Sequence, residues 1–269
     1  MRVWILLASV LFSAAVNAER LVSAGGSLTE IIYALGAEQN LVGVDSSSQY
    51  PSAALALPDI GYYRALNVEG VLSVEPEKLL LLEGSGPQTV LSQLEALGVK
   101  ATVINNPKSI DGLFTTIAQV AKATNRLEQG KTLIAGIQEQ LAQVSRLPAL
   151  RDKTAVFLMS AGDRGLVAAG QNTTPQLIFD HLNVVNPFAE LQGFKTVSPE
   201  VMATHGPDII LLASHTSRDL TESTLCEAPQ LALWASEKGC KLYKVDSLQF
   251  IGLTPRLADA IAQTHELLK

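Results

Sequence analysis

Short apolar segments alternate with helical segments in two runs along the chain, and one long helical stretch separates the two runs. In the first run the sequence predicts strands over 21–25, 41–45, 78–84 and 101–106, with helices between them. The third of these strands, KLLLLEG, is apolar enough to be buried on both faces, as strands of a parallel sheet are. Strand–helix alternation of this kind is typical of βαβ units, so the first run predicts an α/β fold.

A helix is predicted directly after the first strand, behind the glycine pair Gly25-Gly26. The residues from Ser27 to Glu30 (SLTE) fit a capping box, in which the serine and glutamate side chains satisfy backbone N–H groups of the first turn. The helix is expected to run to Gly36, because glycine commonly ends helices.

The helical stretch between the two runs is Leu127–Val144, which contains no strand and is closed by Pro148. Strand–helix alternation then resumes with Thr154–Gly162. We therefore predict two Rossmann-like α/β lobes joined by a single long α-helix. The predicted bounds are 19–123 for the N-terminal lobe, 124–148 for the linking helix and 149–269 for the C-terminal lobe.

Two segments of similar sequence indicate that the lobes are structurally related. EGVLSVEPEKLLLL (69–82) and EVMATHGPDIILLA (200–213) align without gaps at an offset of 131 residues (200 − 69). The alignment pairs Glu69 with Glu200 and one strongly apolar strand with another. In open α/β sheets, ligands bind beyond the carboxyl ends of the strands, so two such lobes predict a ligand cleft between them.

The N-terminal segment predicts export. Met1–Ala18 has a positive charge at Arg2, then a short apolar run, and ends in Val16-Asn17-Ala18, which are the parts of a secretory signal peptide. We expect cleavage near Ala18 and an exported mature chain. A retained membrane anchor is the alternative.

The formal charge of the exported chain bears on whether it binds nucleic acid. Removing Arg2 from the 20 basic side chains leaves 19 against 26 acidic ones, a formal charge of −7 (19 − 26). This balance argues against a nucleic-acid partner, which requires a basic face.

The two cysteines, Cys226 and Cys240, lie close in sequence, and in an exported protein such a pair predicts a disulfide. Two free thiols are the alternative.

The segment PDIGYYRALNVEG (58–70) places two tyrosines and an arginine together on a loop, in a chain with only 5% aromatic residues. A phenol has an ordinary pKa of about 10, and a neighbouring guanidinium favours its phenolate form. A phenolate is a hard anionic oxygen ligand suited to ferric iron, and tyrosine is an established axial ligand of haem iron. From the residues alone, Tyr62 and Tyr63 are either ligand-binding residues or one core and one surface side chain.

From Glu19 to its C-terminus, the chain resembles the periplasmic haem-binding proteins of bacterial haem ABC importers. These belong to a helical-backbone class of substrate-binding proteins that also serves siderophores and cobalamin. The matching stretches are LVSAGGSLTEIIYALG, LVGVDSSSQYP, LPDIGYYRALNVEGVLSVEP, VAAGQNTTPQLI and FIGLTPR. The resemblance implies that Tyr62 is the haem-iron ligand and that Arg64 hydrogen-bonds the ligating oxygen. Tyr63 stands where an aliphatic residue is usual, so we interpret it as pocket wall or support.

Other residues are candidates for contacts with the haem propionates or the pocket wall. Gly26 and Ser27 open a helix whose N–H groups favour a carboxylate. Asn172 is expected to be either a pocket donor or an ordinary helix cap. His215 ends an apolar strand, and the prediction places it on the cleft as a distal contact or iron ligand.

The loop Met159–Gly170 contains an arginine but no histidine. Some proteins of the family that the chain resembles have a histidine in this loop as a further iron ligand, so its absence argues against that ligand and against stacked double haem. Arg164 in the loop is expected either to pair with a propionate or to be a solvated charge.

Glu69 and Glu200 occupy equivalent positions, each at the start of a predicted helix. Acidic residues there stabilise a helix by about 0.3–1 kcal/mol each. In the class that the chain resembles, such a pair forms salt bridges with arginines of the transmembrane permease. The resemblance therefore implies an inner-membrane ABC permease as partner of a monomeric protein, with an outer-membrane haem receptor system as an indirect partner.

We interpret the sequence as a periplasmic substrate-binding protein that captures haem and delivers it to an ABC permease. The alternative is the same scaffold with cobalamin or a ferric siderophore as cargo. An enzyme is not expected, because the chain has no G-x-S-x-G elbow, H-E-x-x-H motif or cysteine–histidine set. Asp45, the serines 46–48 and Asp246 are interpreted as ordinary loop residues. Arg256 is interpreted either as a structural residue or as a residue near the mouth of the cleft.

Overall fold

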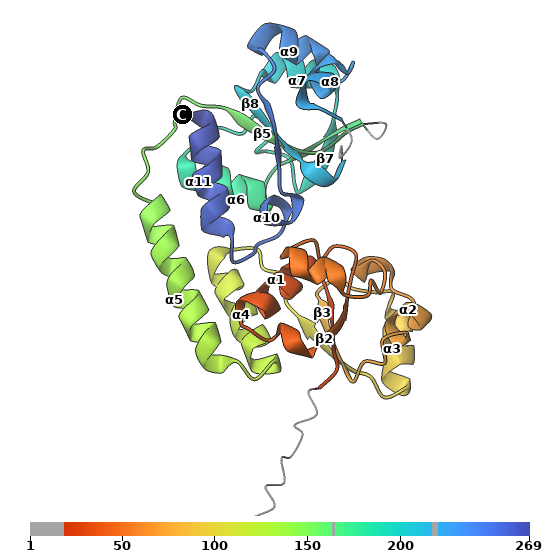
Figure 1. Ribbon diagram of the computed structural model, residues 1–269. Coiled ribbons are helices and arrows are strands. Elements are labelled where there is room, and N and C mark those ends of the chain that lie inside the picture. Colours follow the sequence, from red (N-terminus) through yellow and green to blue (C-terminus); the bar gives the residue numbers. More distant parts are fainter. Residues whose placement is uncertain (1–18, 163–164, 217–219) are drawn as a thin grey trace, which may run out of the picture.

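The computed structural model describes residues 19–162, 165–216 and 220–269 and shows two α/β lobes, one above the other in Figure 1. The helix α5 (Leu127–Val144) runs along one side of the molecule from the lower lobe to the upper one. This arrangement confirms the predicted fold class of two Rossmann-like lobes joined by a single long helix. The predicted signal peptide lies outside the described residues.

The N-terminal lobe is built on a four-stranded, all-parallel sheet in the order β2-β1-β3-β4. Its strands are β1 (Leu21–Ala24), β2 (Leu41–Val44), β3 (Lys78–Leu82) and β4 (Lys100–Ile104). The four leucines of β3 are all buried, as their continuous run predicts for an inner strand of a covered parallel sheet.

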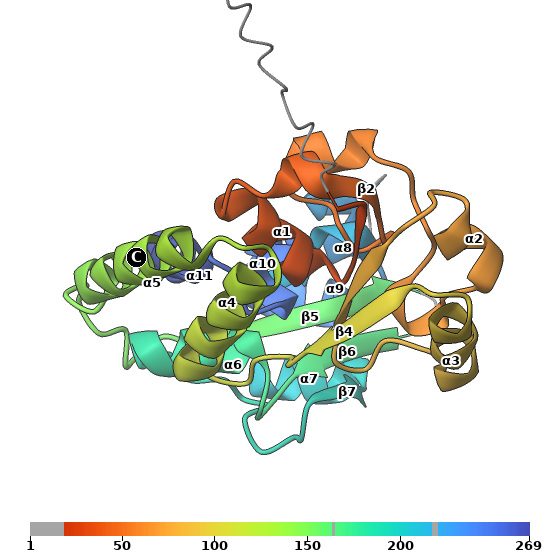
Figure 2. The same ribbon diagram turned by 90° about the horizontal axis from the view of Figure 1, so that it is seen from below.

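Helices cover this sheet on its two sides, as Figure 2 shows. On one side lie α1 (Gly26–Ala34) and α4 (Ile110–Ala123), and on the other lie α2 (Val68–Leu72) and α3 (Gln88–Ala96). Short 3₁₀ turns complete the lobe at η1 (Glu38–Asn40), η2 (Ser52–Ala56) and η3 (Tyr63–Ala65).

The C-terminal lobe has a five-stranded mixed sheet in the order β7-β6-β5-β8-β9. Its strands are β5 (Ala155–Gly162), β6 (Gly165–Ala169), β7 (Phe194–Val197), β8 (Ile209–Ala213) and β9 (Leu242–Val245). The strands β5, β8 and β9 are parallel, whereas β6 and β7 pair in antiparallel fashion. The strand–helix alternation of the sequence did not predict this antiparallel edge.

Helices on the C-terminal lobe form two groups. One group consists of α6 (Thr174–Leu182), α10 (Ser247–Ile251) and α11 (Leu257–Leu268), and α11 also packs against α5. The other consists of α7 (Pro199–His205), α8 (Glu222–Glu227) and α9 (Ala232–Lys238), and η4 (Ser214–Thr216) follows β8. The predicted disulfide is present and joins Cys226 of α8 to Cys240, which lies between α9 and β9.

Side-chain alternation along β5 and β8 gives this lobe a core on each face of its sheet. Phe157 and Leu211 belong to a large apolar core that continues into the N-terminal lobe. Their neighbours Val156 and Ile210 belong to a second core, which is filled by Trp234 of α9. The two lobes are therefore joined by a shared apolar core as well as by α5.

The repeat found in the sequence falls on equivalent elements of the two lobes. The strands β3 and β8 coincide residue for residue at the offset of 131 (209 − 78). Glu69 and Glu200 both lie in the first turn of their helices, α2 and α7, and both side chains are exposed.

The predicted capping box at the start of α1 is wrong. The N-cap residue is Gly25, and no side chain caps the helix. Glu30 is only 3% exposed, and its carboxylate contacts the guanidinium of Arg256 from the other lobe at 2.9 Å. The glutamate therefore serves an ion pair between the lobes rather than the backbone of its own first turn.

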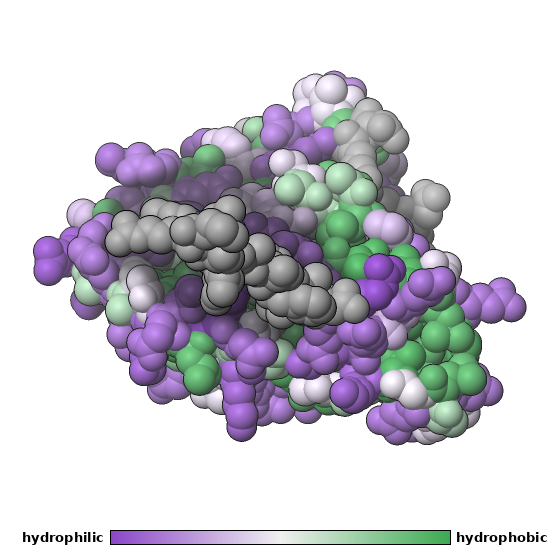
Figure 3. Space-filling model, turned by 60° about the horizontal axis from the view of Figure 1, so that its bottom comes forward, coloured by the Kyte–Doolittle hydropathy of each residue, from purple (hydrophilic) through white to green (hydrophobic). Residues whose placement is uncertain are grey.

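The surface of the lower lobe is shown in Figure 3. Hydrophilic side chains cover most of this face, and hydrophobic ones gather toward its right-hand side. Large apolar side chains that are exposed in the N-terminal lobe include Leu97 and Val103. Within the described residues, none of the helices combines the length and the hydropathy that a membrane span requires.

The ion pair of Glu30 predicts a particular pH dependence of stability. Burial raises the pKa of this carboxyl above its ordinary value of 4.5, although hydrogen bonding and charge attraction from Arg256 oppose the rise. The folded state then binds the proton more readily than the unfolded chain, so the stability that Glu30 contributes is complete below pH 4.5 and is lost as the pH rises through the raised pKa.

We expect urea unfolding to show this effect when wild type is compared with Glu30→Gln. The free energy of unfolding of wild type minus that of the variant should decrease as the pH is raised from 4.5, on top of a constant offset from the changed contact to Arg256. Glu128→Gln is the matched control, since Glu128 pairs with Lys131 at an exposed site on α5. A difference between wild type and Glu30→Gln that is the same at every pH would contradict this prediction.

Candidate functional site

A cavity of about 910 Å³ lies between the two lobes. Several residues that line the cavity come shortly after the carboxyl ends of strands in both sheets. Gly26 follows β1, Ser47 follows β2, His215 follows β8 and Ser247 follows β9. This is the position that the open α/β sheets predict for a ligand. The volume falls within the range typical of sites for small molecules and cofactors.

Apolar side chains from both lobes form much of the cavity wall. They are Leu82, Met159, Leu177, Phe194, Leu248, Ile251 and Leu253. Phe194 is supported from behind by Phe157, whose ring centroid lies 6.5 Å away in an edge-to-face arrangement. Phe157 in turn stacks on Phe250 with ring centroids 6.1 Å apart, so the aromatic wall is held by the core of the C-terminal lobe.

The two tyrosines of the 58–70 segment both line the cavity, but their environments differ. Tyr62 is 45% exposed, whereas Tyr63 is 8% exposed, and their rings meet edge to face with centroids 4.9 Å apart. Burial raises the pKa of Tyr63, although the charge of Arg64 opposes the rise. Tyr63 is therefore held as a neutral phenol in the wall, and Tyr62 is the phenol that a ligand can reach.

Arg64 is placed differently from what the resemblance implies. Its Nε donates a hydrogen bond of 2.8 Å to the hydroxyl of Tyr63, and its guanidinium lies 5.2 Å from the centroid of that ring. The expected bond was to the oxygen of Tyr62. The 3₁₀ turn η3 begins at Tyr63 and contains Arg64, whereas Tyr62 precedes the turn in an extended conformation.

The buried carboxylate of Asp45 organises the loops on this side of the cavity. It is 1% exposed and accepts five hydrogen bonds of 2.7–3.2 Å. The donors are the backbone N–H groups of Gly25, Ser47 and Tyr63 and the hydroxyls of Ser47 and Ser48. One side chain thus fixes the turn after β1, the loop after β2 and the tyrosine loop relative to one another.

Close backbone contact explains the glycine pair that opens α1. Gly25 has φ +135, and a Cβ at this position would lie 2.6 Å from Cβ of Leu82. A Cβ on Gly26 would lie 2.3 Å from the carbonyl oxygen of Ser47. The N–H of Gly26, predicted to favour a ligand carboxylate, donates to the hydroxyl of Ser47, and the N–H of Gly25 donates to Asp45, so both amides are bonded within the protein.

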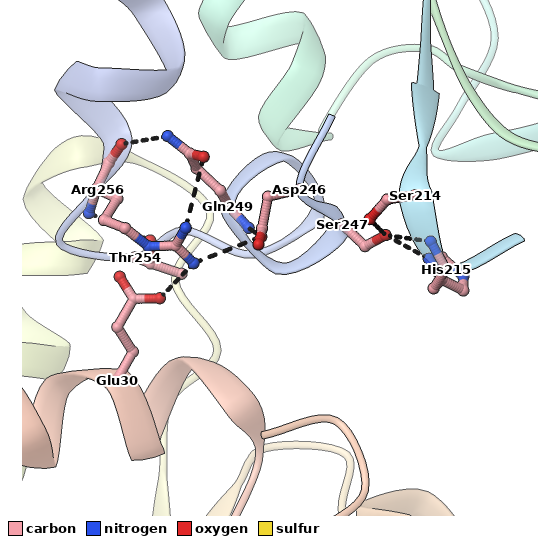
Figure 4. Close-up of polar contacts among 8 residues, drawn as sticks. All are labelled: Glu30, Ser214, His215, Asp246, Ser247, Gln249, Thr254 and Arg256. Carbon is pink, nitrogen blue, oxygen red and sulfur yellow. Dashed lines mark hydrogen bonds and ion pairs between the residues drawn. The ribbon is translucent and has the colours of Figure 1, made fainter. Parts of the chain in front are cut away.

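Asn172 and His215 line the C-terminal side of the cavity. Asn172 has φ +59 and donates to the side chain of Gln192 at 2.9 Å. The helix-cap alternative for Asn172 is wrong, because Thr173 is the N-cap of α6. His215 contacts the hydroxyl of Ser247 through both its backbone N–H, at 3.0 Å, and its ring Nδ1, at 2.6 Å (Figure 4).

The structure brings together seven of the predicted site residues on the cavity wall, namely Gly26, Ser27, Tyr62, Tyr63, Arg64, Asn172 and His215. Arg164 lies outside the described residues. Glu69 and Glu200 do not line the cavity, which agrees with a role at the surface.

Sequence reasoning missed three charged residues near the site. Asp45 and Asp246 were interpreted as ordinary loop residues, and Lys108 in the cavity lining received no role, whereas Arg256 was assigned either a structural role or a place near the mouth of the cleft. A signal for Asp45 was available, since an aspartate followed by three serines at the end of a strand offers one acceptor beside several donors. No comparable signal marks Arg256, because Glu30 lies 226 residues away.

Two α/β lobes around a cleft, joined by one long helix, define a ligand-capturing binding protein. Residues 21–232 match the family model described as periplasmic binding protein, and the chain belongs to this family. Members of the family are substrate-binding proteins of transport systems found in the periplasm.

The chain is similar to heme-binding proteins and to vitamin B12-binding proteins. The chain is 31% identical to the periplasmic heme-binding protein RhuT from Roseiflexus sp. RS-1 in apo form, with a TM-score of 0.84 over 93% of this chain and 98% of that chain. It is 32% identical to the periplasmic heme-binding protein HutB of Vibrio cholerae, with a TM-score of 0.83 over 93% and 99%. It is also 28% identical to a vitamin B12-binding protein of Yersinia pestis (strain Pestoides F), over 80% of this chain and 76% of that protein.

The contacts of Asp45 predict the effect of Asp45→Asn. The amide would present a donor to N–H and O–H groups that need an acceptor, so we expect unfolding free energy to fall by about 3 kcal/mol. Asp59→Asn is the matched control, since Asp59 is exposed and accepts one bond, from the N–H of Gly61. Its effect should stay below about 1 kcal/mol. Equal effects of the two substitutions in urea unfolding would contradict the role of Asp45.

Proposed function

We propose that this protein captures haem in the periplasm through an iron–phenolate bond from Tyr62 and delivers it to an inner-membrane ABC permease. The observation that carries the proposal is the placement of Tyr62, a half-exposed phenol on the wall of a cavity between two lobes that is lined by both apolar and polar side chains. Tyrosine is a known axial ligand of haem iron. Transport of a ligand requires no reaction at this site, so we do not propose an enzymatic activity.

The two tyrosines divide two tasks in this proposal. Tyr62 loses its proton and binds the ferric iron as an anionic oxygen ligand. Tyr63 stays neutral, because burial raises its pKa, and it holds the Arg64 guanidinium beside the iron ligand through a 2.8 Å hydrogen bond. The positive charge of Arg64 is thereby kept beside the tyrosine doublet.

The rest of the cavity suits a flat, apolar macrocycle with acidic substituents. The apolar and aromatic walls contact the faces of the ring, which is how most cofactor sites bury their ligand. Arg64 and Lys108 are lining residues with permanent positive charge within the described part of the chain, and they are the proposed partners of propionates. Asn172 and His215 supply polar groups on the opposite side of the cavity.

Similarity to known proteins supports haem and also keeps a second cargo open. The RhuT and HutB structures, which are 31% and 32% identical to this chain, are named heme-binding proteins, which favours haem. The Yersinia pestis relative is named a vitamin B12-binding protein, which favours cobalamin on the same scaffold as the second candidate. Both cargoes are metal macrocycles, and only haem requires the phenolate of Tyr62.

Hemin titration separates these two candidates. Wild type should bind hemin with the visible spectrum of a high-spin ferric tyrosinate complex, and Tyr62→Phe should lose that spectrum and weaken binding by more than about tenfold, or about 1.4 kcal/mol. Tyr63→Phe is the matched control and should keep the spectrum. Excess cyanocobalamin should not displace hemin. An unchanged spectrum in Tyr62→Phe, or tighter binding of cyanocobalamin than of hemin, would refute haem capture by this residue.

We also propose that Glu69 and Glu200 dock the two lobes onto the permease. Both are exposed first-turn residues of equivalent helices in the two lobes. The hydroxyl of Ser198 donates a hydrogen bond that lowers the pKa of Glu200, so this carboxylate stays charged into the acidic range. One carboxylate on each lobe gives a permease a contact on either side of the cleft, through which it can separate the lobes and release the ligand.

Docking is tested by binding of the hemin-loaded protein to nanodiscs that contain the permease. The double substitution Glu69→Gln and Glu200→Gln should weaken this binding at least about tenfold, while hemin affinity is retained because neither residue lines the cavity. Glu128→Gln, at an exposed pair on α5, controls for loss of one surface charge. Equal permease binding by wild type and the double variant would exclude docking through these two carboxylates.

A further inference from the structure

One arginine connects the N-terminal lobe to the helix that lines the cavity in the C-terminal lobe. Arg256 precedes α11, and its Nη2 donates to Oε2 of Glu30 at 2.9 Å. The same Nη2 lies 3.4 Å from Oδ1 of Asp246. Figure 4 shows the guanidinium above Glu30 of α1, with Asp246 and Gln249 beside it on the C-terminal lobe.

The partners of Arg256 in the C-terminal lobe hold α10. Asp246 is the N-cap of this five-residue helix and accepts from the N–H of Gln249 at 2.7 Å. The side chain of Gln249 contacts Arg256 twice at 3.5 Å, once at its carbonyl oxygen and once at Nη1. Helix α10 supplies Ser247, Leu248 and Ile251 to the cavity wall, so these contacts fix one wall of the cavity.

The N-terminal lobe contacts the same guanidinium at a second residue. The ring centroid of Tyr50 lies 3.7 Å from the guanidinium carbon, which is a close cation–π contact. Tyr50 comes from the loop after β2, the strand that ends at Val44 and is followed by Asp45. A planar guanidinium can meet a carboxylate, an amide and a ring face at once, which a lysine cannot do.

Stability alone does not explain this network, because removing its charged groups from water costs free energy. Glu30 is 3% exposed and the side chain of Arg256 15% exposed, and among the described residues Oε1 of Glu30 and Nε of Arg256 have no hydrogen-bond partner. Buried ion pairs contribute little net stability compared with apolar residues of similar size. The ion pair of Glu30 and Arg256 is better explained by the defined geometry that it gives to the two lobes.

We propose that Arg256 is a positioning residue of the ligand site. By contacting Glu30 and Tyr50 of one lobe and Asp246 and Gln249 of the other, it sets the separation of the lobes and the place of α10 before the ligand arrives. A cleft ordered in advance loses less conformational entropy on binding, so the ligand binds more tightly than to lobes that move independently. The inference rests on the proposed function only in taking the cavity as the ligand site.

The test measures lobe separation and ligand affinity in the same variants. Spin labels at Leu97→Cys and Leu233→Cys report the distance between the lobes, because these positions are 62% and 52% exposed on opposite lobes. Labelling without reductant keeps the disulfide of Cys226 and Cys240 intact. The variants are Arg256→Met, Arg256→Lys and Glu30→Gln, with Glu128→Gln as the control from an exposed ion pair.

Arg256→Met and Glu30→Gln should broaden the distance distribution of the ligand-free protein and raise the Kd for hemin about tenfold. The position of the tyrosinate band should not change, because Tyr62 is intact. Arg256→Lys keeps the charge but not the planar fork, so its effects should lie between those of wild type and Arg256→Met. Glu128→Gln should match wild type in both measurements.

Wild-type distances and wild-type affinity in folded Arg256→Met and Glu30→Gln would overturn the proposal. Loss of the folded protein in all three network variants, seen by circular dichroism, would also overturn it by showing that the network serves stability alone. If wild type itself does not bind hemin, the proposed function fails, but the distance distributions still test whether Arg256 sets the lobe geometry.

Discussion

The N-terminal half of the site depends on the hydrogen bonds that the buried carboxylate of Asp45 accepts. A buried charge is expensive unless its hydrogen bonds are satisfied, and here three loops that approach the end of one sheet provide five donors. The loops cannot shift independently without leaving that charge unpaired. The tyrosine doublet therefore stands on a fixed base, although Tyr62 itself is half exposed.

A second charged group, the partly buried Arg256, has the same kind of role between the lobes. Asp45 orders one lobe internally, whereas Arg256 relates that lobe to α10 of the other. The helix α5, whose 18 residues extend about 27 Å, adds a stiff connection alongside. Together with the shared apolar core, these features favour a cleft that changes little when ligand enters and that opens when both lobes are pulled from outside.

The sequence predicted the parts of this fold that local pattern determines. The leucine run of β3 and the related run of β8 identified two inner strands, and the helical period of 127–144 identified the connection between lobes. The antiparallel β6 and β7 were not predicted, because short edge strands leave little pattern beyond alternation.

The sequence predicted those parts of the site whose residues lie close together along the chain. The loop with Tyr62 and Tyr63 was recognised because its residues are adjacent, and placing it on the cavity needed only the rule that ligands bind at strand ends. The hydrogen bond from Arg64 to Tyr63 was not predicted, because the 3₁₀ turn after Tyr62 cannot be seen in the residue pattern. Glu30 was interpreted as a cap because its true partner is distant in sequence and belongs to the other lobe.

The central claim is that one phenolate oxygen, from Tyr62, binds the ferric iron of a macrocycle in the cleft. Resonance Raman spectra of the hemin-loaded protein test this bond directly, when the protein is compared with the same protein grown on ring-deuterated tyrosine. The account predicts phenolate vibrations of an iron-bound tyrosine that shift on deuteration and that vanish in Tyr62→Phe. A spectrum without deuterium-sensitive phenolate bands, or with the bands retained in Tyr62→Phe, would contradict it.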